Sequence, residues 1–166
     1  MQKMDFRALV DGYGTKVLNT AMRILGDAQK AQDVHQEVFL AIWQRWHKFN
    51  GHTNWDGYLY RATIRKAIRI AKQSRAESLP EQSSEHFVSN QQPDGLLRAV
   101  ELRRKLTKCL AKLPKRQADI FVLSRIEGLK HERIAQMLGC SENTVRVHLH
   151  RAVKRLIQQL GGYLSE

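Results

Sequence analysis

Apolar residues recur along this chain at the three- and four-residue spacing of helices, and no segment shows the alternation typical of a strand. The first segment predicts one amphipathic helix that starts near Phe6 and ends at Gly26. We therefore expect an all-α protein. Because a helix with one apolar stripe must bury it against other helices, the natural layout is two small helical bundles. The stripe of the first helix consists of Phe6, Leu9, Val10, Tyr13, Val17, Leu18, Ala21, Ile24 and Leu25.

The formal net charge of +12 is spread unevenly over the 166 residues. Residues 1–75 hold thirteen basic and six acidic residues, and residues 99–166 hold fourteen and six. Residues 76–98 hold one basic and four acidic residues, carry two prolines and show little apolar periodicity. We predict two domains, 1–75 and 99–166, joined by a flexible acidic linker over 76–98. A basic chain favours a polyanionic partner, although charge alone is also compatible with a solvated basic face.

Several classes of protein are excluded by composition. The longest apolar run, Val38 to Trp43, is six residues long, whereas a membrane span needs about 18 or more. The first residues mix charges with apolar groups and contain no continuous core of a secretory signal, so we expect a cytoplasmic protein. Cys109 and Cys140 are not in a CxxC motif and are expected to be thiols rather than a disulfide or a metal pair.

The segment from Leu113 onward predicts three short helices. The first is expected to start after Pro114, to bury Ile120, Phe121 and Leu123, and to stop at Gly128. The second runs from about Lys130 to Leu138. Gly139 can then adopt the left-handed conformation that closes a helix, and Ser141 can accept a backbone N–H as the N-cap of the third helix. This order of elements indicates a helix-turn-helix.

The third helix separates an apolar stripe from a polar face. Val145, Leu149, Ala152 and Leu156 are spaced by four, three and four residues and therefore share one side. The other side combines groups that can bond the bases and phosphates of duplex DNA. This combination favours DNA recognition over an ordinary solvated face. The candidate contacts are Asn143, Thr144, Arg146, Val147, His150, Arg151 and Lys154.

Residues 113–156 resemble region 4 of the extracytoplasmic-function sigma factors, the small promoter-specificity subunits of bacterial RNA polymerase. The resemblance implies that the third helix reads the promoter's minus-thirty-five element, with Arg146, Val147, His150 and Arg151 at contact positions. His148 stands where the family usually has Arg or Lys. The motifs that carry the resemblance are Leu113-Pro114-x-Arg116-Gln117, Glu127-Gly128-Leu129, Ile134-Ala135-x-x-Leu138-Gly139, Thr144-Val145-Arg146 and Leu149-His150-Arg151-Ala152.

The second predicted helix carries an acidic face in this basic chain. Asp33, Gln36, Glu37 and Leu40 lie on that face, away from the core stripe of Val34, Val38, Ala41 and Ile42. An acidic face repels DNA phosphates and favours a protein partner, but a solvated face is about as compatible with the composition. The block from Asp33 to Trp43 is similar to sigma region 2, whose surface docks on the largest polymerase subunit. That resemblance assigns Asp33, Gln36, Glu37 and Leu40 to polymerase binding.

Aromatic and basic residues follow this helix in close succession. Aromatic rings that stack on unpaired bases, together with cations along the backbone, are expected for single-stranded DNA. Trp46, Tyr58 and Trp55 could instead belong to the bundle core. In the resembling family, the loop over residues 49–57 holds a flipped base of the minus-ten element. The candidate residues for that element are Phe49, Asn50, Trp55, Arg61, Arg65 and Arg69, of which Arg65 and Arg69 replace the usual Asn and Asp.

The two blocks occur in the order of the family and imply a minimal sigma factor that consists of regions 2 and 4. The implied partners are core RNA polymerase, promoter DNA as duplex and melted strand, and an anti-sigma factor. No cofactor, metal or small-molecule substrate is expected. The closest alternative is a helix-turn-helix regulator that does not engage polymerase.

A metal-dependent hydrolase is a more distant alternative. The histidines form neither an HExxH motif nor a Cys/His ligand set, so no enzymatic activity is expected. They are His35, His47, His52, His86, His131, His148 and His150.

Overall fold

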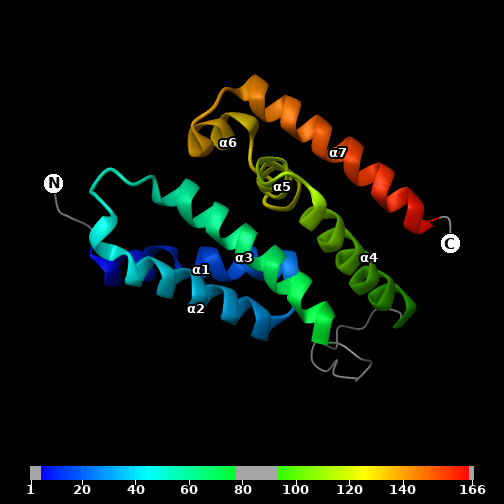
Figure 1. Cartoon of the computed structure of the whole chain (residues 1–166), viewed down its shortest axis with the longest axis horizontal. Coiled ribbons are helices and arrows are strands. Elements are labelled where there is room, and N and C mark those ends of the chain that lie inside the picture. Colours follow the sequence, from blue (N-terminus) through cyan, green and yellow to red (C-terminus); the bar gives the residue numbers. More distant parts are fainter. Residues whose placement is uncertain (1–4, 78–92, 165–166) are drawn as a thin grey trace.

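The computed structural model describes residues 5–77 and 93–164, and every regular element in these ranges is a helix, as the sequence predicts (Figure 1). The first part holds α1 (Phe6–Leu25), α2 (Ala28–Gln44), the 3₁₀ turn η1 (Trp46–Lys48) and α3 (Trp55–Glu77). The second part holds α4 (Pro93–Lys112), α5 (Lys115–Phe121), the π-helical turn η2 (Val122–Ile126), α6 (His131–Leu138) and α7 (Glu142–Leu164).

Aspartate side chains cap the N-termini of the first two helices, and the predicted end of α1 at Gly26 is confirmed. The Asp5 side chain accepts a hydrogen bond from the Ala8 backbone N–H at 2.7 Å, and Asp27 accepts one from that of Lys30 at 3.0 Å. Gly26 ends α1 with a left-handed φ of 63°, which glycine adopts without a Cβ penalty. These caps fix the sharp α1–α2 turn and so define the direction of α2.

The helix-turn-helix is present in the second part, with two differences from expectation. Gly139 adopts φ 64°, and the Ser141 hydroxyl accepts the Thr144 backbone N–H at 3.1 Å, so the predicted turn and N-cap are confirmed. The helix after Pro114 is interrupted, because the Glu127 N–H bonds the Val122 carbonyl over five residues. Phe121, expected in the core, is only half-buried because it lies at the edge of α5 rather than on the stripe of Ile120 and Leu123.

The predicted linker boundaries need correction. The helix α3 continues to Glu77 and α4 already starts at Pro93, so 76–77 and 93–98 are helical. Proline suits the first turn of a helix, where its missing N–H would have no partner, and Asp94 complements the positive end of the helix dipole. The rest of the expected linker, 78–92, lies outside the described residues.

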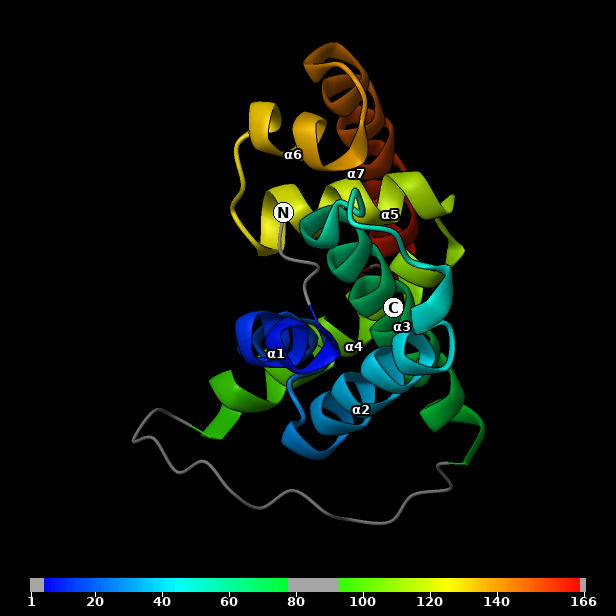
Figure 2. The same cartoon turned by 90° about the vertical axis from the view of Figure 1, so that its left-hand side faces the viewer.

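The two parts pack against each other through α3. One side of α3 lies on α1 and α2, and another lies on α4, α5 and α6 (Figure 2). Buried side chains from both parts form one continuous apolar cluster. Three ion pairs cross the junction: Arg23–Glu127 at 2.9 Å, Arg65–Asp119 at 3.0 Å and Arg133–Asp56 at 2.7 Å. The sequence left the relative orientation of the two parts open, and this contact defines it.

Asp56 is shared by both parts. It bonds Lys16 of α1 at 2.8 Å and Arg133 of α6 at 2.7 Å. Burial by itself raises the pKa of Asp56, but the hydrogen bond and charge of Lys16, together with Arg133, outweigh it and hold the pKa below its usual value. The ionised carboxylate therefore stabilises the packed form.

Replacing Ile64 with Ala should lower the free energy of unfolding by about 2 to 5 kcal/mol, because this fully buried side chain of α3 would leave a cavity. Urea denaturation measures the change. Ile157 is the matched control, since it is 65% exposed on α7 and its replacement with Ala should change stability by no more than about 0.5 kcal/mol. Equal losses for the two variants would contradict the assigned core.

Replacing Asp56 with Asn should lower the free energy of unfolding by about 1 kcal/mol near pH 7. The loss is small because Lys16 and Arg133 are about half exposed and solvent weakens their ion pairs. A carboxyl whose pKa is lowered by folding stabilises above its unfolded pKa, and this contribution is lost as the pH falls through the folded pKa. The gap between wild type and Asp56→Asn should therefore close below about pH 4. Denaturation at several pH values tests this, with the exposed Asp11→Asn as control; a gap independent of pH would contradict it.

Candidate nucleic-acid interface and docking face

The exposed side of α7 carries the residues predicted to contact duplex DNA. Val145, Leu149, Ala152 and Leu156 are buried, which confirms the apolar stripe. Six of the seven candidates are exposed on the remaining surface, whereas Thr144 is half-buried and shares a 2.9 Å hydrogen bond with the Ser141 hydroxyl. The exposed candidates are Asn143, Arg146, Val147, His150, Arg151 and Lys154.

His148 lies between the buried and exposed sides of α7. Its Nδ1 is buried without a hydrogen-bond partner within the described residues. Burial, and then the charges of Arg116 and Arg151, lower the pKa of this imidazole. The neutral ring therefore adds no positive charge to the DNA-facing side at pH 7.

The acidic face of α2 is accessible in the packed structure. Gln36 and Glu37 are exposed, Asp33 is half-buried with Gln29 at 3.4 Å, and Leu40 is 54% exposed. Both views place α2 and α7 on opposite sides of the molecule with α3 between them (Figures 1 and 2). A protein bound to α2 would therefore leave α7 open to DNA.

Trp43 extends this face, and the sequence analysis did not assign it a role. It is 58% exposed and its ring lies 4.8 Å from that of Phe6. Gln36, Leu40 and Trp43 have the i, i+4, i+7 spacing that places residues on one side of a helix. That spacing could have placed Trp43 on the acidic face. It was not used because a tryptophan at the end of an apolar run is more often buried.

Glu37 already forms ion pairs within the protein. Its carboxylate lies 2.6 Å from the Lys66 ammonium and 3.6 Å from the Arg69 guanidinium, both on α3. Arg69, which we expected on the strand-binding side, thus lies next to α2 and apart from the site of Arg65. Asp33, the other carboxylate of the acidic face, is not part of this ion-pair cluster.

His35 occupies the inner side of α2. Its ring packs 4.8 Å from that of Phe39 and lies close to Gly14 of α1, where a Cβ would crowd it. Burial lowers the pKa of His35, so the neutral ring packs on the inner side of α2.

The predicted base-binding aromatics form a single cluster at the start of α3. Trp46 stacks on Trp55 with ring centroids 5.7 Å apart, and Phe49 lies 4.9 Å from Trp55 and 5.3 Å from Tyr58. All four rings are half-buried, so they are less buried than core side chains and less exposed than rings that are free to stack on a base. Asn50 is exposed in the preceding turn and accepts the His52 N–H at 3.2 Å.

Two of the predicted strand-binding arginines are held by contacts within the protein. The Arg61 Nε donates to the Gly57 carbonyl of its own helix at 3.1 Å, and Arg65 donates to Asp119 of α5 at 3.0 Å. The Asp119 side chain is only 2% exposed. Burial raises its pKa, and the charge and hydrogen bond of Arg65 offset this only in part. Sequence reasoning did not identify this carboxylate as a partner of α3.

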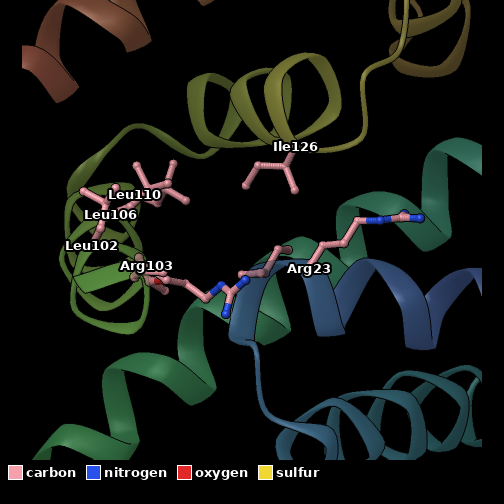
Figure 3. A pocket seen from close by; sticks show the side chains of 9 residues that line it. Arg23, Leu102, Arg103, Leu106, Leu110 and Ile126 are labelled. Carbon is pink, nitrogen blue, oxygen red and sulfur yellow. The ribbon is translucent and has the colours of Figure 1, made fainter. Parts of the chain in front are cut away.

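A cavity of about 260 Å³ lies between α1, α4 and η2 (Figure 3). Ile24, Leu102, Leu106 and Leu110 give it apolar walls, with Arg23 and Arg103 at its edge. Within residues 5–77 and 93–164, no group of three or more His, Cys, Asp or Glu could hold a metal ion, and His86 lies outside these ranges. In the same ranges no helix is long and apolar enough to cross a membrane.

Comparison with known families assigns both parts of the chain. Residues 9–77 match Sigma-70 region 2, and residues 103–156 match Sigma-70 region 4. The chain is 30% identical over 169 residues to the ECF RNA polymerase sigma factor SigL of Mycobacterium tuberculosis, covering 93% of this chain and 90% of the relative. It is 29% identical over 174 residues to the RNA polymerase sigma-H factor of Pseudomonas aeruginosa, covering 99% and 90%.

A solved structure supports the fold. The chain resembles CnrH, solved in complex with the cytosolic domain of CnrY, with a TM-score of 0.51 and 22% identity over 95% of this chain and 88% of that one. The two regions in the family's order, together with near full-length similarity to established members, show that this chain belongs to the extracytoplasmic-function sigma factors, non-enzymatic subunits that direct promoter recognition by RNA polymerase.

Proposed function

We propose that this sigma factor divides its work among three surfaces. The acidic face of α2, formed by Asp33, Gln36, Glu37 and Leu40, docks on core RNA polymerase. The exposed side of α7 reads the minus-thirty-five element in the major groove. The loop before α3 and the arginines of α3 bind the melted minus-ten strand. The proposal depends most on the accessible acidic face and the accessible recognition helix lying on opposite sides of one chain.

Charge supports this division. Positive side chains on α7 attract duplex phosphates, whereas α2 combines carboxylates with an exposed Leu40 and Trp43, as expected of a face that meets protein rather than DNA. A regulator that never engaged polymerase would have no use for such a face.

An anti-sigma protein in the cytoplasm completes the proposal. The related CnrH is described in complex with the cytosolic domain of CnrY. In this chain, α4 carries several exposed apolar side chains, of which Leu102 also lines the cavity of Figure 3, and exposed apolar groups that gather on one helix favour a protein partner. These side chains are Leu96, Leu97, Val100 and Leu102.

Replacing Asp33 with Ala should weaken assembly with core polymerase about tenfold, equivalent to about 1.4 kcal/mol, because one carboxylate of the docking face is lost. Fluorescence titration of labelled sigma with core polymerase measures the dissociation constant. Asp11→Ala is the control, since Asp11 is exposed on α1 and carries the same charge. Identical affinities for both variants would remove α2 from the docking surface.

Replacing Arg146 or Arg151 with Ala should relax selection of the minus-thirty-five sequence, since an arginine that bonds a base edge contributes about 1 to 3 kcal/mol of discrimination. In vitro transcription with core polymerase over a promoter library measures the preference at each position. Arg155→Ala removes the same charge from an exposed position further along α7 and should lower binding without changing the preferred sequence. If all three variants select the wild-type promoters, α7 does not read sequence through these residues.

A further inference from the structure

The cavity between α1, α4 and η2 has walls that suit an apolar ligand. Leu102, Leu106 and Leu110 lie along α4 on one side of it, and Ile24 of α1 and Ile126 of η2 add to the lining (Figure 3). The lining residues belong to none of the three surfaces proposed above for polymerase and DNA. The cavity is therefore a candidate binding site of its own.

Burial increases along the three leucines of α4. Leu102 is 56% exposed, Leu106 is half-buried and Leu110 is 1% exposed. The leucine wall thus has an open end at Leu102 and a closed end at Leu110. An apolar group that covered Leu102 would remove its side chain from water, which is favourable.

A cation lies next to the open end of this wall. Arg103 follows Leu102 in α4, lines the cavity and extends toward α1 in Figure 3. Its guanidinium lies so close to Gly26 that a Cβ there would collide with it. Within residues 5–77 and 93–164, Arg103 forms no ion pair with a carboxylate. An anionic ligand would therefore not compete with an acidic side chain of these ranges for Arg103.

Arg23, the other arginine at the cavity, already has an anionic partner. Its Nη1 donates to both carboxylate oxygens of Glu127, at 2.9 and 3.2 Å. In Figure 3 its guanidinium points away from the leucines, so its aliphatic stem is the part that lines the cavity. The charge of the site thus calls for one anionic group, placed at Arg103.

The volume of the cavity limits the size of the ligand. A cavity of about 150 Å³ holds benzene, or about 25 Å³ for each carbon, and on that scale this cavity of about 260 Å³ holds about ten carbons. One turn of a helix, a cylinder about 10 Å wide and about 5.4 Å long, fills about 420 Å³. A single chain therefore fits where a helix of a partner protein does not.

We propose that this cavity binds a small amphiphile, a carboxylate with one unbranched chain of about eight to ten carbons. The carboxylate pairs with the Arg103 guanidinium, whose planar fork matches it, and the chain lies along Leu102, Leu106 and Leu110. The ligand contacts α1, α4 and η2 together. The proposal does not depend on the roles assigned to α2, α3 and α7.

Isothermal titration of the full chain with octanoate tests the head group. Arg103→Gln should weaken binding about tenfold or more, because the charged hydrogen bonds to the carboxylate are lost. Arg104→Gln is the matched control, since it removes the same charge from the next, exposed residue of α4, which does not line the cavity. Equal affinities of the two variants for octanoate would overturn the assignment of Arg103.

A second pair of variants tests the place of the chain. Ala99 lines the cavity and is exposed, so Ala99→Phe should occupy the space of the ligand and abolish octanoate binding without disturbing the core. Val100→Phe adds a ring at the neighbouring position of α4, which is 46% exposed and outside the lining, and should bind octanoate as the wild type does. Circular dichroism checks that both variants keep their helices. Octanoate binding by Ala99→Phe that equals that of Val100→Phe would overturn the site.

Two further probes separate the head group from the chain. Octan-1-ol keeps the chain without the charge, and acetate keeps the charge without the chain, so both should bind the wild type at least about tenfold more weakly than octanoate. An alcohol that bound as tightly as octanoate would overturn the requirement for an anion. If the wild type binds no octanoate at all, the proposal is wrong, and the cavity is then better explained as a recess for a side chain of a protein partner.

Discussion

The helix α3 must serve two neighbours, and the rest of the structure depends on this constraint. Its apolar residues, with Ile64 at the centre, are needed by α1 and α2 to complete the first bundle. Its charged residues point both to α2, through Lys66 and Glu37, and to α5, through Arg65 and Asp119. A single helix therefore links the docking face, the strand-binding residues and the second bundle, and none of these can move without changing the surroundings of α3.

Local structure was predictable because its causes are local. Gly26 and Gly139 end helices through a backbone conformation that glycine adopts easily, and Ser141 caps a helix three residues away. The buried stripe of α7 likewise follows from helical spacing alone. The family resemblance added the proposed roles of α2 and α7, because these roles belong to short motifs that remain recognisable in this sequence.

Contacts between the two parts were not predictable from the sequence. Arg65 and Asp119 are 54 residues apart, and Asn54 and Met137 are 83 apart, so no periodicity connects them. Arg65 is a departure from the usual family residue, and its added charge was interpreted as favouring DNA; the structure pairs it with a buried acid instead. Arg69 was similarly grouped with Arg65, although one helical turn brings it near Glu37. Both ion pairs were missed for the same reason, since sequence patterns give the face of a helix but not which other element covers it.

The packing of the two parts on α3 can be tested directly. The faces of α2 and α7 are exposed, whereas α3 lies between the two parts of the chain. The most direct measurement is the distance between spin labels on the exposed residues His52, before α3, and Gln136, on α6, with both native cysteines replaced by serine. Our account predicts one short, narrowly distributed distance, because the start of α3 packs against α6; a long or broadly distributed distance would contradict that packing.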